Sequence, residues 1–498
     1  MHRVTSSGAI ATPKPQPFTS RSAQARWWLL TDGAIVVGYV ALVTAWSFLI
    51  SLNGGPDELN HLFLVEYILQ FGSIPKPQID PVVPFVGHLT GVEFPNGTPW
   101  YADLPFLHSL CAAAIAKFVS AALPSGAGYF GARLFDWLLG GIFVFTLIRV
   151  LLWSGLQPLA VRLIALLIAT IPQVTFIFAY FNHDAFGVAA VTLALHAFLR
   201  VVKQSGSVLP DAIYFGASSG LVLLSKPYHY PALMFFTLML LLMWGVDFAF
   251  PLKAIAARAV ASAILVSAPM LVWIYLHVGT VFIGLNLLTG KSHACFVLCN
   301  GVLAHWHSIW SFAKVNFYSF FAVFGWMGIY LPTGFYLIWF LPIALSFGLL
   351  SVVYIAKRTK AFWWCDNQAA LFDAGFVTLT ILMLLGTALM SLANSQIREL
   401  QPQGRYLFVV LPFVAYCIAL YAKEMQNRVA ARYGSSSGDM AATAGYRLGY
   451  NFVVIVLALL TTGMLFVNIL AAFFVLAPAY GKLWWFVRSI LLRPLLSL

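Results

Sequence analysis

The segment NGGPDELNHLF, residues 53–63, places two carboxylates and an imidazole directly after a long apolar run. Only 9% of the residues in the chain are charged, which makes Asp57, Glu58 and His61 conspicuous. Adjacent carboxylates beside an apolar segment can act as a general base, as metal ligands or as part of an ion relay. If residues 57–71 are helical, the two carboxylates point about 100° apart and do not share one proton. A plainer alternative is that Asp57 only caps the helix.

Further polar clusters follow apolar segments later in the chain. Lys226 and Arg405 could hold a phosphate group, because charge-assisted hydrogen bonds to phosphate oxygens are strong. Alternatively, each only extends its charged end toward the lipid headgroups. Asp184 could join Asp57 and His61 around a divalent metal ion, but the spacing is not that of a dense metal motif, so a metal is not favoured. The clusters are Asn182-His183-Asp184, Lys226-Pro227-Tyr228-His229 and Gln403-Gly404-Arg405.

The composition is that of a membrane protein. Of 498 residues, 61% are hydrophobic, and the mean hydropathy is +0.87. Runs of about 18 or more apolar residues recur along the chain, which predicts an all-α polytopic membrane protein. The net charge of +12 does not indicate nucleic-acid binding, because the basic residues are scattered in short loops. An ion-coupled transporter is disfavoured too, since acidic residues such as Asp32 and Asp136 lie near the ends of apolar segments.

The order of the segments predicts one transmembrane module, residues 26–477, with about eleven spanning helices. It follows a disordered cytoplasmic tail, 1–25, and precedes a periplasmic or surface-lying C-terminal tail, 478–498. Two stretches, 52–130 and 279–334, are too long for ordinary connections. The predicted spanning segments are 27–51, 131–152, 159–180, 185–202, 210–225, 230–247, 257–278, 335–356, 371–393, 405–422 and 450–477.

The placement of residues 105–122 decides the orientation of the chain. This segment is apolar enough to span but carries His108 and Lys117. If it spans, the basic clusters at 357–360 and 423–432 move to the outside of the membrane. If it lies flat on the surface, most Lys and Arg fall on the side of the N-terminus. The positive-inside rule favours the flat placement and a cytoplasmic N-terminus, so that both long loops and all the polar clusters face outward.

These features resemble the GT-C superfamily of integral membrane glycosyltransferases, which includes the protein O-mannosyltransferases and the aminoarabinose transferase of lipid A. In that superfamily an acidic motif follows the first helix, and helices that lie on the membrane surface come next. Residues 101–118 are similar to the stretch that opens one of these surface helices. Residues 130–145 are similar to the start of the second helix in these enzymes. A closer resemblance is to a family of bacterial predicted membrane proteins within that superfamily. The stretches that match its motifs are PDELNH (56–61), NHDAF (182–186), LSKPYHY (224–230), FGWMGIYLP (324–332) and QGRYLFVVLP (403–412).

The resemblance implies an inverting enzyme at the outer face of a bacterial inner membrane. It would move a sugar from a polyprenyl-phosphate donor to a lipid-linked or cell-envelope glycan acceptor, with membrane lipid as a further partner and no required cofactor. Asp57 matches the superfamily's catalytic base, and Glu58 the residue beside it, which would orient the acceptor. The donor phosphate would be held by Lys226, Arg405 and Arg133. Substrate contacts would come from His61, His183, Asp184, Tyr228, His229, Gln403 and Trp326.

Two other functions remain open on these residues. A glycan ligase or polymerase that uses lipid-pyrophosphate donors would need similar cations, but no base of this kind after the first helix. A non-catalytic exporter of lipid or polysaccharide would need a broad hydrophilic cavity, whereas these polar residues cluster at one surface. Cys295 and Cys299, in the second long loop, could form a disulfide or be two small buried side chains.

Overall fold

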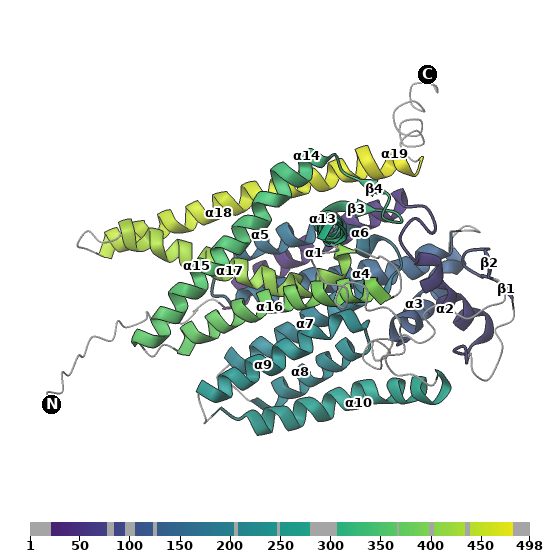
Figure 1. The fold of residues 1–498 in the computed structure, drawn as a ribbon, viewed down its shortest axis with the longest axis horizontal. Coiled ribbons are helices and arrows are strands. Elements are labelled where there is room, and N and C mark those ends of the chain that lie inside the picture. The colour runs from purple at the N-terminus through teal and green to yellow at the C-terminus, as the bar shows by residue number, and fades with distance from the viewer. Residues whose placement is uncertain are drawn as a thin grey trace, which may run out of the picture.

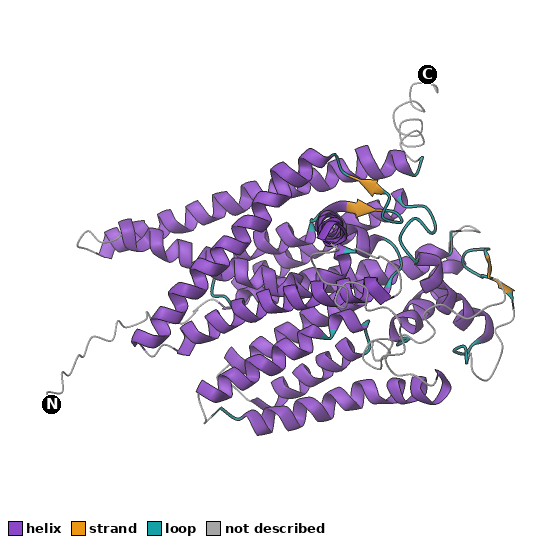
Figure 2. Ribbon diagram, in the orientation of Figure 1, coloured by secondary structure: helices purple, strands orange, loops and turns teal. Residues whose placement is uncertain are grey.

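The computed structural model of the chain describes residues 21–76, 84–94, 105–122, 127–203, 208–246, 250–278, 306–365, 368–397, 403–433 and 439–481. These residues are helical almost throughout (Figure 2). The predicted tail before residue 21, residues 279–305 of the second long loop with Cys295 and Cys299, and the end of the chain after residue 481 lie outside them.

The helices follow one another along the chain with few strands between them. The longer helices are α1 (Arg21–Leu49), α2 (Glu58–Phe71), α3 (Leu107–Val119), α4 (Tyr129–Leu152), α5 (Pro158–Ala169), α6 (Pro172–Ala179), α7 (His183–Lys203), α8 (Val208–Leu223), α9 (Pro231–Val246), α10 (Leu252–Val278), α13 (Trp306–Ala322), α15 (Leu341–Cys365), α16 (Gln368–Ile397), α17 (Leu411–Tyr433) and α18 (Asp439–Leu470). Short helical segments are η1 (Ser120–Ala122), η2 (Pro227–His229), α14 (Thr333–Phe335), η4 (Tyr336–Phe340), η5 (Gly404–Val410), η6 (Ala471–Leu476) and α19 (Ala477–Ala479). Two antiparallel hairpins pair β1 (Phe85–Val86) with β2 (Glu93–Phe94) and β3 (Val323–Phe324) with β4 (Ile329–Tyr330).

Most of the long helices run roughly along one direction as a bundle, and small elements collect at one end of it (Figure 1). α2, α3 and the β1–β2 hairpin lie at that end, where α2 packs on α3 and α3 on α4. The most deeply buried of the candidate spans are α7 and the continuous segment of η5 and α17. Asp184 lies at the start of the first of these spans and Arg405 at the start of the second. Both residues are therefore carried by the most buried helices of the bundle.

The predicted polytopic helical architecture is confirmed, with one or two fewer candidate spans than the eleven predicted. Among the described residues, nine helices are long and apolar enough to cross a membrane, or ten if α5 and α6 form one bent span. These two helices meet at 69°, and α6 begins with Pro172, which lacks the N–H needed to continue the α5 ladder. The remaining predicted segment, 210–225, forms α8. Its 16 residues reach about 24 Å, less than the ~30 Å of a bilayer core.

The ambiguous segment 105–122 forms α3, a helix of 13 residues. At about 1.5 Å per residue it is roughly 20 Å long, too short to cross the bilayer core. One face of α3 is buried, including His108, Ala112 and Ala116, while Phe118 is exposed. A short helix with one buried and one exposed apolar face agrees with the predicted placement along the surface.

Candidate functional site

The acid loop, residues 53–57, joins α1 to α2 and has the sequence Asn-Gly-Gly-Pro-Asp. Asn53 and Asp57 have positive φ angles of 59° and 63°. Asn and Asp are among the few residue types that tolerate this left-handed region. A Cβ atom at Gly55 would overlap the ring of Tyr180, so only glycine lets the loop pack against that ring. The local sequence therefore turns the chain sharply and sets Asp57 at the start of α2.

Asp57 occupies the N-cap position of α2, but its side chain makes no capping hydrogen bond. Its Oδ2 atom instead accepts a hydrogen bond from Nη2 of Arg405 at 3.1 Å. The Asp57 side chain is 21% exposed, whereas that of Arg405 is 3% exposed. The capping alternative therefore lacks its hydrogen bond, and the carboxylate stays within reach of a ligand.

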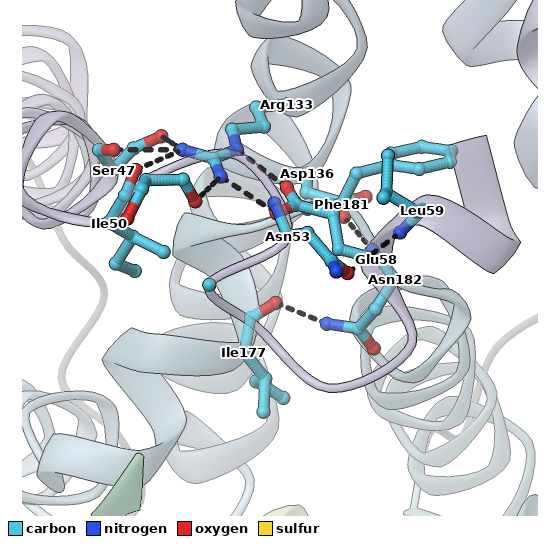
Figure 3. A network of polar contacts seen from close by, with 12 residues as sticks. Ser47, Ile50, Asn53, Glu58, Leu59, Arg133, Asp136, Ile177, Phe181 and Asn182 are labelled. Atoms are coloured by element: carbon cyan, nitrogen blue, oxygen red, sulfur yellow. Dashed lines mark hydrogen bonds and ion pairs between the residues drawn. The ribbon is translucent and has the colours of Figure 1, made fainter. Parts of the chain in front are cut away.

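Glu58 points toward a different cation (Figure 3). Its buried carboxylate accepts two hydrogen bonds from Arg133, with Nε at 2.7 Å and Nη2 at 2.8 Å. The backbone N–H groups of Phe181 and Asn53 donate to the same carboxylate at 3.1 and 2.9 Å. The remaining Arg133 N–H groups donate, at 2.9 Å each, to the backbone oxygens of Ser47, Ile50 and Ser51.

This network engages both Glu58 oxygens and all five N–H groups of Arg133. No Arg133 donor is left for a phosphate, and no Glu58 oxygen is left for an acceptor hydroxyl. The geometry therefore does not support the substrate roles expected for these two residues. The pair instead joins the end of α1, the start of α2 and the residue two before α7, which fixes the position of Asp57.

Lys226 and Arg405 converge on one buried carboxylate. Nζ of Lys226 lies 3.0 Å from Oδ1 of Asp184, and Nε of Arg405 lies 3.5 Å from Oδ2. Nη1 of Arg405 donates to the hydroxyl of Tyr180 at 3.0 Å. Burial lowers the pKa of Lys226, while the charge of Asp184 opposes that shift. With the partly exposed Asp57, the cluster holds two carboxylates and two cations, so their formal charges cancel before a ligand enters.

Local sequence explains why these elements meet. Asp184 opens α7, where its N–H donates to Oδ1 of Asn182 at 2.7 Å. Lys226 precedes η2, which begins with Pro227. A Cβ atom at Gly404 would overlap the backbone of α13, so glycine lets η5 pack there and hold Arg405 at the cluster.

Three buried histidines, His61, His183 and His108, lie next to one another near the cluster. Nδ1 of His61 is 3.0 Å from Nδ1 of His183, and the ring of His108 packs against that of His183, with centroids 4.6 Å apart. Nε2 of His108 is 2.6 Å from Oδ1 of Asp136. Burial lowers the pKa of His61 well below its usual range, and the charge of Lys226 lowers it further. Burial likewise lowers the pKa of His108 to about 3, so both imidazoles are neutral at pH 7.

The other predicted substrate residues surround the same place. The ring of Tyr228 stacks on that of Tyr406 with centroids 4.0 Å apart. His229 is buried near the carbonyl of Lys226. The side-chain oxygen of Gln403 is buried and has no hydrogen-bond partner among the residues that the structure describes, so it can accept one from a ligand. Trp326 lies apart from them, on the β3–β4 hairpin, and donates from Nε1 to the backbone oxygen of Asn53 at 3.0 Å.

Three residues of the site had no role in the sequence-based prediction: His108, Asp136 and Tyr180. His108 and Asp136 lie in the stretches 101–118 and 130–145 that resemble GT-C helices, and Tyr180 ends an apolar segment, but none of the three was assigned a role. The signal available in the sequence is a polar residue within an apolar run, which both His108 and Asp136 provide. Within the described ranges, no group of three or more His, Cys, Asp and Glu side chains is arranged to hold a metal ion.

Comparison with known families gives one match. Residues 88–414, more than half of the chain, match the model of a family described as "Predicted membrane protein (DUF2142)". No curated protein matches the sequence.

Solved structures give distant similarities. The ArnT structure from Cupriavidus metallidurans bound to undecaprenyl phosphate is 14% identical, with a TM-score of 0.47 over 92% of this chain and 75% of that one. The oligosaccharyltransferase of Archaeoglobus fulgidus, tethered to an acceptor peptide, is 13% identical, with a TM-score of 0.49 over 92% of this chain and 55% of that one. This chain thus spans about half the length of the second enzyme.

Proposed function

The chain belongs to the DUF2142 family of predicted membrane proteins, and from that premise we propose that it is a membrane glycosyltransferase. It transfers a sugar from a polyprenyl-phosphate donor to a lipid-linked or cell-envelope glycan acceptor at the periplasmic face of a bacterial inner membrane. The observation that carries the proposal is the accessible carboxylate of Asp57 beside the buried cluster of Lys226, Asp184 and Arg405. The sequence resemblance to GT-C enzymes supports the same reaction.

In this mechanism Asp57 is the general base. It accepts the proton of the acceptor hydroxyl while the oxygen forms a bond to the anomeric carbon from the face opposite the phosphate. The bond between that carbon and the phosphate oxygen breaks, its electron pair leaves with polyprenyl phosphate, and the anomeric centre is inverted.

Arg405 couples the two halves of the reaction. Before transfer, its guanidinium shares a hydrogen bond with Asp57. When Asp57 takes up the proton, its carboxyl becomes neutral and its attraction for Arg405 weakens. The guanidinium, together with Lys226, is then available to the charge that grows on the leaving phosphate. Preorganised cations in a site with little water are worth several kcal/mol in this role.

The direct test incubates purified protein with radiolabelled polyprenyl-phosphate sugars and a cell-envelope glycan fraction. Labelled glycan and free polyprenyl phosphate are expected, and Asp57→Asn should fold normally but lose about 10²–10⁴ in turnover. Glu93→Gln, which alters an exposed carboxylate on β2, serves as the matched control. Transfer only from lipid pyrophosphates would indicate a ligase or polymerase, and undiminished turnover in Asp57→Asn would refute the role of the base.

A further inference from the structure

The β3–β4 hairpin carries an indole to the acid loop. Trp326 lies in the turn between the two strands, and its side chain is 56% exposed. Its N–H donates to the backbone oxygen of Asn53, four residues before Asp57. One edge of the ring is therefore fixed to the loop that holds the proposed base, while more than half of the side chain stays open.

Backbone strain is concentrated at this contact. Among the described residues, the only ones other than glycine with positive φ are Asn53, Asp57 and Met327. Two belong to the acid loop and the third follows Trp326, which Gly325 precedes with a φ of 60°. Met327 has no polar side chain to compensate for the left-handed backbone, a conformation that persists only where the surroundings impose it and that clusters at functional sites.

A second aromatic residue holds the neighbouring backbone oxygen of the loop. The hydroxyl of Tyr480 donates to the oxygen of Gly54, next to the one that accepts from Trp326. The loop is thus held at its first two residues by aromatic side chains and at its last residue by Arg405. The loop therefore connects two side chains of different chemistry: the cation Arg405 contacts it at Asp57, and the exposed aromatic ring of Trp326 contacts it at Asn53.

We propose that Trp326 stacks against a pyranose ring of the glycan acceptor; this rests on the proposed function. The C–H groups of a pyranose carry partial positive charge and fit the negative face of an indole. A purely structural tether would need only the N–H and would leave no reason to expose the ring. A membrane-interface Trp turns its N–H toward water and headgroups, whereas this one donates to the backbone.

Saturation-transfer NMR on the purified protein tests this with methyl glucoside, methyl mannoside and methyl galactoside as probes. We expect saturation of ring C–H protons of at least one probe by the wild type, and about tenfold weaker binding by Trp326→Leu. Trp326→Phe keeps an aromatic face and should retain most of the binding. Trp310→Leu removes an indole of similar exposure, 60%, from α13 and should bind as the wild type does.

Three results would overturn the inference: no probe bound by the wild type, undiminished binding by Trp326→Leu, or equal losses in Trp326→Leu and Trp310→Leu. Donor turnover is measured separately on the same preparations. Trp326-dependent binding without any turnover would refute the proposed function and leave the saccharide site standing. Turnover without Trp326-dependent binding would refute the inference alone.

Discussion

At the scale of single residues, Arg405 is the most constrained side chain of the site. It contacts Asp57, Asp184 and Tyr180 through three different nitrogens. A lysine has one nitrogen on a flexible stem and cannot reproduce this fork. The identity of Arg405, and not only its charge, is therefore expected to matter.

Arg405→Lys and Lys226→Gln should each weaken use of the donor by about 1–3 kcal/mol, on the scale of a charge-assisted hydrogen bond. The loss should be the same for any sugar on the same lipid, because these residues contact the phosphate in the proposed mechanism. Donor KM and turnover with two different sugars would measure it. Arg428→Lys, a half-exposed position farther along α17, is the control. Unchanged donor affinity with altered sugar preference would place the cations in the sugar pocket instead.

The sequence pointed to Asp57, Lys226 and Arg405 because each stands out against an apolar neighbourhood. It did not reveal how Glu58 is used, because its partner Arg133 is 75 positions away and nothing local links the two. The same limit applies to His108 and Asp136, which lie on different helices and meet only after those helices pack. Candidate site residues can be selected from the sequence, whereas contacts between residues far apart in the sequence become visible only in the folded structure.

At the scale of elements, α2 and α3 each contribute a buried neutral histidine. The pKa of His61 and that of His108 are lowered by burial, below the value of about 6.5 in an unfolded chain. Below pH 6.5 the unfolded state therefore binds more protons than the folded state. The free energy of unfolding is therefore highest above that pH. It decreases as the pH falls, by up to about 1.4 kcal/mol per pH unit for each histidine.

Thermal unfolding in detergent between about pH 7 and pH 5 would measure this effect. His61 is faced by His183, Lys226 and Arg405, and His108 by Asp136 and His183, so several charges share the response. His108→Gln should flatten the pH dependence, whereas His88→Gln, on an exposed turn, should leave it as it is. Equal unfolding temperatures at both pH values would contradict the prediction.

The positions of the apolar helices along the chain were predicted well, because long apolar runs are a strong signal. Every segment expected to span appears as one continuous helical segment or, for 159–180, as two, but α8 has only 16 residues, as its predicted segment does, which is too few to cross a bilayer core. It packs closely on α10, where Gly216 and Gly220 leave no room for a Cβ atom against Ala259 and Ala263. Such close contact between helices depends on both partners and is not visible in either segment alone.

At the scale of the whole molecule, the orientation in the membrane follows from the basic residues and stays a prediction. We expect β1 and β2 on the periplasmic side and the C-terminal end of α17 on the cytoplasmic side. In a variant without native cysteines, Val86→Cys should react with a membrane-impermeant reagent in intact cells. Arg432→Cys should react only after permeabilisation; both positions are exposed. Labelling of both sites in intact cells, or the reverse pattern, would invalidate the assignment.

The tethers of the acid loop also have a consequence for biosynthesis. A ribosome releases the chain from its N-terminus, so the loop reaches the membrane long before the residues that hold it. Arg133 comes first, Trp326 and Arg405 much later, and Tyr480, directly after α19, later still. During most of synthesis the loop therefore lacks its final shape. A nascent chain stalled before Tyr480 would be inserted in the membrane yet unfinished at Gly54, so the proposed transfer activity would arise only after Tyr480 has been made.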